Sequence, residues 1–243
     1  MGRSSAEAGQ ETLLTLAHIT EAAKRDEIDG IVYGPLNKQA MRAAGHTAGD
    51  ELDFFNSHLT ANGLTGEINI LDQLWTSRVT SHVPLGEVAP LITRERVRAA
   101  IELLSTSLTR SGTKAPRLAL AALNPHAGEG GAFGTEETEV LAPAIAEARS
   151  RGLNVSGPFP SDTIFPRALA GAFDGIITMY HDQGQIALKL IGLGRGITLL
   201  AGFPLSIATP GHGTAYDIAG TGKANPEGLL AATRLVLRMM SGK

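Results

Sequence analysis

The sequence predicts an α/β protein with a mostly parallel sheet that helices cover on both faces. Short apolar runs alternate with longer segments of helical periodicity along the 243-residue chain. The 29 glycines suit the many tight loops of such a fold. Because no linker-like segment interrupts the alternation, we expect any second domain to be interleaved with the first.

The first expected element is an amphipathic helix over residues 5–26, whose apolar face carries Leu13, Leu16, Ile19 and Ala23. Apolar, β-rich runs predict strands at 31–33, 67–74, 116–123, 153–156, 174–179 and 196–200. Helical patterns predict further helices at 37–44, 50–60, 93–112, 135–152 and 226–240.

Composition excludes several classes of protein. The net charge of -3 gives no basic excess for a nucleic-acid or membrane surface. Without cysteine there is neither a disulfide nor a thiolate site. The N-terminus is polar, and no apolar run approaches the roughly 20 residues of a membrane span. We therefore expect a cytoplasmic protein with no nucleic-acid or membrane partner.

Three histidines, His82, His126 and His181, follow or interrupt apolar stretches. We expect them at strand ends, where α/β proteins place their sites. Three neutral imidazoles form a common set of ligands for a divalent metal. Alternatively, the three are unrelated and hydrogen-bond locally, because separations of 44 and 55 residues match no metal motif. Their polar or helical contexts identify the other candidates as surface residues: His18, His46 and His58.

A glycine-rich loop follows His126 and leads into a helix. Glycines let the main chain approach an anion, and the free N–H groups of a helix start favour negative charge. A second small-residue loop, His212–Gly220, contains Asp217. This carboxylate can accept hydrogen bonds from a ribose or adenine; the alternative interpretation is a helix N-cap.

Other charged residues are candidates for proton transfer. Lys189 lies in an apolar context, which would lower its pKa and let it exchange a proton with substrate; the alternative is a surface lysine. Asp162 and Asp182 are candidate carboxylates near a metal, although Asp162 also fits a helix N-cap. Lys38 follows a strand and a Gly-Pro turn, which either places it at the site or only turns the chain.

Together these motifs resemble the 4-hydroxythreonine-4-phosphate dehydrogenase family of vitamin B6 biosynthesis. The matching strings are GPLNK, SHVPL, LNPHAGEGGAFGTEE, GPFPSDTIF, MYHDQGQIALK, GRG and GHGTAYDIAGTGKANP. The HGTAYDIAG run is also similar to the adenine-side loop of isocitrate and isopropylmalate dehydrogenases. The resemblance implies their fold: two interleaved α/β/α lobes with the active site in the cleft. We expect residues 1–40 with 215–243 to form one lobe, and 41–214 the other.

The resemblance also implies roles for particular residues. The metal histidines fall on His82, His126 and His181, and the substrate lysine falls on Lys189. Asp162, with Asp182, matches the acidic part of the active site. The expected NAD contacts are Gly128, Glu129, Gly130, His212, Gly213, Thr214, Asp217 and Ile218.

The chain departs from the family at the phosphate ligands. The family's asparagine and arginine fall here on Thr198 and Ile207. Its Gly-His-Thr motif falls on Asp50-Glu51-Leu52, while Gly45-His46-Thr47 lies several residues too early. Glu51 and Thr198 are therefore expected substrate contacts. Because an arginine–phosphate pair is strong and bidentate, its loss argues against a phosphorylated substrate.

The resemblance implies a homodimer whose subunits both contribute to each site. It also implies a strand and glycine turn before residues 5–26, so the chain resembles a family member that lacks its N-terminal segment. The expected function is metal-dependent, NAD-linked oxidation of a secondary hydroxyl next to a carboxylate-bearing carbon, after which decarboxylation can follow. Zinc, magnesium, manganese, cobalt and nickel all remain candidates for the metal.

Two alternatives stay open. The chain is either a paralogue that oxidises dihydrodiol carboxylates or sugar acids, or a remnant that binds metal or partner without turnover. A kinase or phosphatase is disfavoured because the sequence has neither a Walker lysine–serine pair nor a nucleophile motif.

Overall fold

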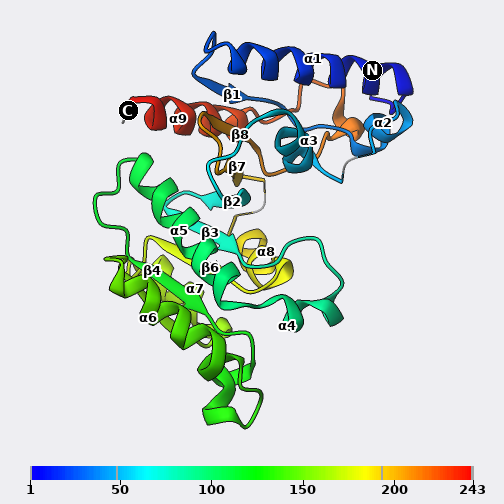
Figure 1. Ribbon diagram of the computed structural model, residues 1–243. Coiled ribbons are helices and arrows are strands. Elements are labelled where there is room, and N and C mark those ends of the chain that lie inside the picture. Colours follow the sequence, from blue (N-terminus) through cyan, green and yellow to red (C-terminus); the bar gives the residue numbers. More distant parts are fainter. Residues whose placement is uncertain (1, 48, 193, 242–243) are drawn as a thin grey trace. The chain divides into compact units, whose positions relative to one another are not determined.

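The computed structural model describes residues 2–47, 49–192 and 194–241, and their contacts divide into two compact units (Figure 1). The first, here called the terminal unit, comprises the described residues up to Thr65 together with Gly194–Ser241. The second, the central unit, comprises the described residues from Gly66 to 192. Each unit contains strands and helices of its own and has an apolar core.

The terminal unit contains a sheet in the order β1-β8-β7, in which β1 and β8 are parallel and β8 and β7 antiparallel. Its strands are β1 (Gly30–Val32), β7 (Ile197–Ala201) and β8 (Ser206–Pro210). Its helices are α1 (Ala6–Lys24), α2 (Lys38–Ala43), α3 (Glu51–His58) and α9 (Glu227–Ser241), with a 3-10 turn η4 (Tyr216–Ile218). Helix α9 packs on all three strands, and a second apolar core joins the strands to α1, α2 and α3.

The side chain of Tyr33 places a polar hydroxyl group in that apolar core. The Tyr33 hydroxyl is buried without a hydrogen-bond partner, and the ring lies 5.9 Å from that of Phe55. Burial raises the pKa of the phenol, and the carboxylates of Glu51 and Asp50 raise this pKa further. The hydroxyl therefore stays neutral and costs the free energy of leaving water.

We expect Tyr33→Phe to raise the free energy of unfolding by about 1 kcal/mol, because it removes a buried hydroxyl that has no partner. Urea unfolding at pH 7 measures this change. Tyr33→Leu is the control: it leaves space beside Phe55 and should destabilise the protein. A clear loss of stability in Tyr33→Phe would show that the hydroxyl is satisfied and contradict the prediction.

The central unit contains a sheet in the order β2-β3-β6-β4-β5. All its neighbours are parallel except the β2–β3 hairpin. Its strands are β2 (Gly66–Leu71), β3 (Leu74–Arg78), β4 (Leu118–Ala121), β5 (Val155–Phe159) and β6 (Gly175–Thr178). Its α-helices are α4 (Val88–Leu91), α5 (Arg94–Arg110), α6 (Ala142–Ser150), α7 (Ser161–Leu169) and α8 (His181–Gly192). Shorter turns are η1 (Leu85–Glu87), η2 (Pro125–Gly131) and the π-turn η3 (Glu137–Leu141).

Alternation along β6 shows how helices cover both faces of this sheet. A Cβ at Gly175 would lie 2.8 Å from Leu104 of α5, so this position faces α5. The next residue, Ile176, belongs to the core formed with α7 and α8. Successive residues of a strand point to opposite faces, so α5 lies on one face and α7 and α8 on the other. The predicted fold class, an α/β protein with a mostly parallel sheet, is confirmed.

The element limits differ from the sequence-based expectations in a few places. The single strand expected at 67–74 is a hairpin, because Asp72 adopts a positive φ of 54° and turns the chain between β2 and β3. The helix expected at 135–152 begins with the π-turn η3. Helices α7 and α8 and strand β8 were not among the expected elements.

The compact units also have different limits from the expected lobes, 1–40 with 215–243 and 41–214. The difference has a structural reason. Helices α2 and α3 join α1 in one core, and β8 pairs with both β1 and β7. These segments therefore belong with the terminal unit. Among the described residues, no helix is long and apolar enough to cross a membrane.

Candidate functional site

Two of the three candidate metal histidines lie next to each other in the central unit. His82 follows β3 and His181 follows β6, and these strands are parallel neighbours. The carboxyl ends of parallel strands meet at one edge of a sheet, which brings the two residues together. Their ring centroids are 5.4 Å apart and the rings are inclined by 45°.

Backbone and hydroxyl hydrogen bonds hold the two histidine segments in register. The N–H of Val79 donates to the Thr178 carbonyl at 2.9 Å, which extends the ladder between β3 and β6. Thr80 then donates twice to the Met179 carbonyl, from its N–H at 3.0 Å and from its hydroxyl at 2.8 Å. Thr80 and Met179 each precede a histidine by two residues, so this contact holds the segments that lead to His82 and His181 side by side.

His181 is oriented by its neighbour. Its Nδ1 lies 2.6 Å from Oδ1 of Asp182. A carboxylate at this nitrogen favours the tautomer with the proton on Nδ1, which leaves the Nε2 lone pair for a metal. Asp182 is thus placed to orient the imidazole of His181.

Gln183 anchors the start of α8 to two other elements. Its Oε1 accepts from the Met179 N–H at 2.6 Å. Its Nε2 donates at 2.8 Å to the Ala122 carbonyl and at 2.8 Å to the Ser161 hydroxyl. The ends of β4 and β6 and the start of α7 are therefore locked together behind His181. Asp162 is the next residue of α7 and is exposed within the helix, where it is not the N-cap.

His126 begins a left-handed turn. Five consecutive residues, His126 to Gly130, have φ between 41° and 78°. This conformation is costly for residues other than glycine, so the turn needs external support. A Cβ at Gly128 would lie 2.7 Å from the Glu137 carboxylate, which explains the glycine at this position.

Buried Glu137 supplies that support. Its Oε1 accepts from the N–H groups of Leu123 at 2.9 Å and Asn124 at 2.8 Å. Its Oε2 accepts from Nδ2 of Asn124 at 2.9 Å. Glu137 was not among the expected site residues, because the sequence places it in a polar run of acidic residues and threonines that gives no signal for burial. A carboxylate of the protein thus accepts from the N–H groups that precede the turn.

The described residues of one chain do not assemble the full set of metal ligands. Within them, no group of three or more His, Cys, Asp or Glu side chains is close enough to hold a metal ion. His82 and His181 lie together, whereas the ring of His126 lies 6.1 Å from that of Phe133. The structure therefore pairs two of the three candidate histidines and places the third elsewhere.

The expected cofactor contacts lie in two loops. In the central unit, Gly128 is buried, whereas Glu129 and Gly130 are exposed. In the terminal unit, the loop from His212 to Ile218 includes Gly213 and Thr214 and ends in η4. Asp217 is exposed inside η4, where Ala215, with a φ of 47°, takes the N-cap position. The alternative role of Asp217 as an N-cap is therefore not realised.

The expected substrate contacts differ in their surroundings. Lys189 is exposed on α8, and its neighbours Ile186 and Leu190 are 60% and 83% exposed. In the terminal unit, Glu51 forms an ion pair with Lys38 at 3.2 Å. Thr198 is half-buried on β7. The neighbouring departure, Ile207, is fully buried in the core of the terminal unit.

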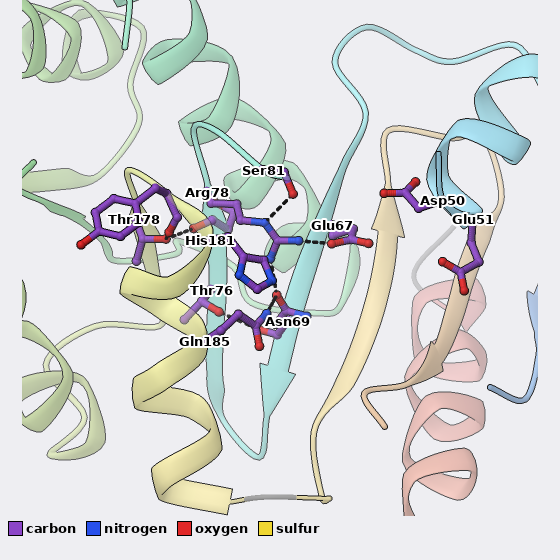
Figure 2. A network of polar contacts seen from close by, with 12 residues as sticks. Asp50, Glu51, Glu67, Asn69, Thr76, Arg78, Ser81, Thr178, His181 and Gln185 are labelled. Atoms are coloured by element: carbon purple, nitrogen blue, oxygen red, sulfur yellow. Dashed lines mark hydrogen bonds and ion pairs between the residues drawn. The ribbon is translucent and has the colours of Figure 1, made fainter. Parts of the chain in front are cut away.

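A buried cation beside the histidine pair was also missed. Arg78 ends β3, and its side chain contacts Glu67, Asn69 and Ser81 (Figure 2). The signal in the sequence is a single arginine in a strand run, four residues before His82.

Comparison with known proteins identifies the family. The model of the family described as "Pyridoxal phosphate biosynthetic protein PdxA" matches residues 1–236. The chain belongs to the PdxA family. The resemblance drawn from the LNPHAGEGG and MYHDQG motifs is therefore confirmed.

PdxA relatives match nearly all of this chain. It is 48% identical over 238 residues to a protein of Pseudomonas aeruginosa named "Putative 4-hydroxythreonine-4-phosphate dehydrogenase 2", a match that covers 97% of this chain and 71% of the relative. The crystal structure of 4-hydroxythreonine-4-phosphate dehydrogenase from Klebsiella pneumoniae is similar with a TM-score of 0.84 and 34% identity, covering 98% of this chain and 73% of that one.

A crystal structure of a dehydrogenase named for a different substrate is also similar. The terephthalate 1,2-cis-dihydrodiol dehydrogenase of Burkholderia xenovorans LB400 has a TM-score of 0.74 and 29% identity, and the match covers 96% of this chain and 74% of that one. The named relatives are thus dehydrogenases that differ in substrate.

Proposed function

We propose that this chain is a divalent-metal-dependent, NAD-linked dehydrogenase that oxidises a secondary hydroxyl next to a carboxylate-bearing carbon. The observation that carries the proposal is the pair of imidazoles, His82 and His181, with a carboxylate orienting the second. Membership of the PdxA family supports the class of reaction, because the named relatives are dehydrogenases.

The donor chemistry of the pair fits a divalent metal. Imidazole nitrogen suits zinc, cobalt and nickel, and a carboxylate behind a ligating histidine is a common supporting contact. When bound, such a metal acts as a Lewis acid that favours loss of the proton from the substrate hydroxyl. The chain's own contribution is to hold His82 and His181 in register through Thr80, Met179 and Asp182.

The third ligand is proposed to be His126 of a second copy of the chain. Within one chain the described acidic and histidine side chains form no complete ligand set. Two large apolar side chains on the His181 helix, Ile186 and Leu190, are exposed, as expected of a face that another subunit covers. A homodimer would complete the site and bury this face.

Proton transfer is assigned to the chain's own side chains. Lys189 follows His181 by eight residues, and contact with a second copy would take its surroundings out of water. Its amine is the group that we assign to accept the hydroxyl proton. Asp162 and Asp182 are the candidate carboxylates for passing the proton on, and both are exposed at helix starts.

The substrate is proposed to lack a phosphate group. Ile207, at the position of the family's arginine, is packed in a core. Glu51 contributes a carboxylate, already paired with Lys38, where the family has a histidine. A dihydrodiol carboxylate fits this chemistry, and the similarity to a terephthalate dihydrodiol dehydrogenase supports it. An unphosphorylated sugar acid is the second candidate.

We expect NAD to bind more tightly than NADP. The His212–Gly220 loop has no arginine to hold a 2′-phosphate, whereas Asp217 is placed to accept hydrogen bonds from a ribose. Calorimetric titration with each cofactor measures the two dissociation constants. Equal or tighter binding of NADP would overturn this assignment.

The proposed function is tested by NADH formation from a panel of hydroxy acids and cis-dihydrodiol carboxylates, with metal and with chelator. We expect NADH with at least one unphosphorylated substrate, abolished by chelation and restored by metal. Metal binding without NADH formation across the panel would favour the alternative, a protein that binds metal or a partner without turnover. NADH formation that survives chelation would reject the metal role.

A further inference from the structure

Arg78 is a buried cation that joins the loop after β3 to strand β2. Only 6% of its side chain is exposed. Its Nε donates to the Ser81 hydroxyl at 2.9 Å, and one terminal nitrogen donates to Oδ1 of Asn69 at 2.6 Å. The other terminal nitrogen pairs with the Glu67 carboxylate (Figure 2). The planar guanidinium fork thus fixes a loop and two positions of β2 at once.

Stability alone does not account for this arrangement. Removing the charges of Arg78 and Glu67 from water costs several kcal/mol per ion, and their attraction often only offsets this cost. An apolar pair of similar volume would hold the β2–β3 hairpin about as well. A role in fixing the positions of neighbouring side chains explains the buried Arg78–Glu67 pair better than a contribution to stability.

The contacts of Arg78 connect to both histidine segments. Ser81 immediately precedes His82, so its bond to Arg78 holds the peptide that carries this ring. The second Arg78 partner, Asn69, also accepts at its Oδ1 from Nε2 of Gln185 at 2.6 Å. Gln185 lies on α8 one turn after His181, on the same face of the helix. The network around Arg78 therefore connects the His82 loop to the helix that begins with His181.

We propose that Arg78 is a positioning residue that sets the separation of His82 and His181 and thereby the affinity of the pair for a divalent metal. This inference rests on the proposed function, since it takes the two histidines as metal ligands. Arg78 acts through Ser81 and Asn69 and touches neither metal nor substrate. Lysine is a poor substitute because it carries the charge without the rigid fork.

Titration of the metal-free protein with Co²⁺ tests this role, with the visible absorption spectrum as a second readout of ligand geometry. We expect Arg78→Lys to weaken Co²⁺ binding by about 10- to 100-fold, the range found for contacts that support metal ligands, and to change the absorption bands. Ser81→Ala should weaken binding in the same direction, and Ser81→Thr, which keeps the hydroxyl, should restore it. Thermal unfolding of each metal-free variant shows whether stability has changed.

Two further variants separate positioning from folding. The double variant Glu67→Met/Arg78→Met replaces both charges of this buried pair with apolar side chains, so it should stay close to wild type in stability yet bind Co²⁺ weakly. The control is Arg117→Met, because Arg117 pairs with Asp174 at 2.8 Å just before β4 and β6 start, at the opposite ends of the strands. It should leave Co²⁺ binding unchanged.

The outcomes distinguish the metal site at His82 and His181 from the positioning role of Arg78. If wild type binds Co²⁺ and the Arg78 and Ser81 variants bind it equally well with the same spectrum, the positioning role is wrong while the metal site stands. Should the Arg78 variants fail to fold, Ser81→Ala and Ser81→Thr decide the question, because they change only a loop hydroxyl. A wild-type protein that binds no Co²⁺ overturns the proposed metal site and the role of Arg78 with it.

Discussion

His181→Ala and His126→Ala are each expected to abolish tight divalent-metal binding, with a loss of affinity of more than about 100-fold. Contacts that only support a ligand already change metal affinity 10- to 100-fold, so removal of a ligand should cost more. His181 is one member of the imidazole pair, oriented by Asp182 at 2.6 Å. Elemental analysis after dialysis measures the retained metal.

His58→Ala is the matched control. The Nδ1 of His58 contacts the Phe54 carbonyl at 2.8 Å, and the ring stacks on Phe54 with centroids 4.1 Å apart. Its role is therefore local, and its loss should leave the metal content unchanged. Wild-type metal content in His126→Ala would show that this histidine is not a ligand.

Mixing the two ligand variants tests whether the site is shared between copies. If His126 comes from a second copy, a mixed dimer of His126→Ala and His181→Ala chains contains one intact site out of two. Random reassociation of equal amounts should then restore about a quarter of the wild-type metal content. A mixture that stays metal-free would place all three ligands within one chain or reject the set.

The second large effect concerns the substrate: phosphorylated 4-hydroxythreonine should be turned over poorly. A phosphate bound without its arginine loses a charge-assisted pair worth roughly 1.5–3 kcal/mol, or about one to two decades in affinity. Ile207 offers no cation in its place, and the Glu51 carboxylate would repel the dianion. Steady-state kinetics should show better turnover of an unphosphorylated hydroxy acid or dihydrodiol carboxylate.

Glu51→Gln provides a test within the same protein. It removes the negative charge but keeps a side chain of the same size, so kcat/KM should rise for the phosphorylated substrate and not for an unphosphorylated one. Glu227→Gln makes the same charge change in the first turn of α9 and should alter neither value. A wild-type kcat/KM for the phosphorylated substrate of about 10⁴ M⁻¹s⁻¹ or more, in the ordinary enzyme range, would contradict the assignment of Glu51 and Ile207.

The sequence predicted most of the fold because periodicity and strand–helix alternation are local signals. Strand β8 was not predicted because its short sequence includes small residues and a proline. Its pairing with β1 and β7 is set by segments that are distant in the sequence. Helix α8 was not predicted because Gly184 lies inside it, and glycine disfavours helices. In the structure Gly184 packs closely on Thr178, a contact that the sequence does not reveal.

The candidate site was predictable to a similar extent. The proximity of His82 and His181 follows from their places after strands, once those strands are parallel neighbours. The network of Arg78 depends on partners from Glu67 to Gln185, so pairwise sequence patterns do not find it. Lys189 is exposed, as its alternative interpretation as a surface lysine predicted, because an apolar sequence context does not say which face of a helix is covered.

The most direct test of the central claim is anomalous scattering from crystals of the protein grown with Co²⁺. We expect an anomalous peak for a Co²⁺ ion whose bonds to the imidazole nitrogens of His82 and His181 are about 2.0–2.2 Å long. We further expect that His126 of a second copy supplies the third nitrogen. Crystals that contain Co²⁺ elsewhere, or none at these two histidines, would contradict the account.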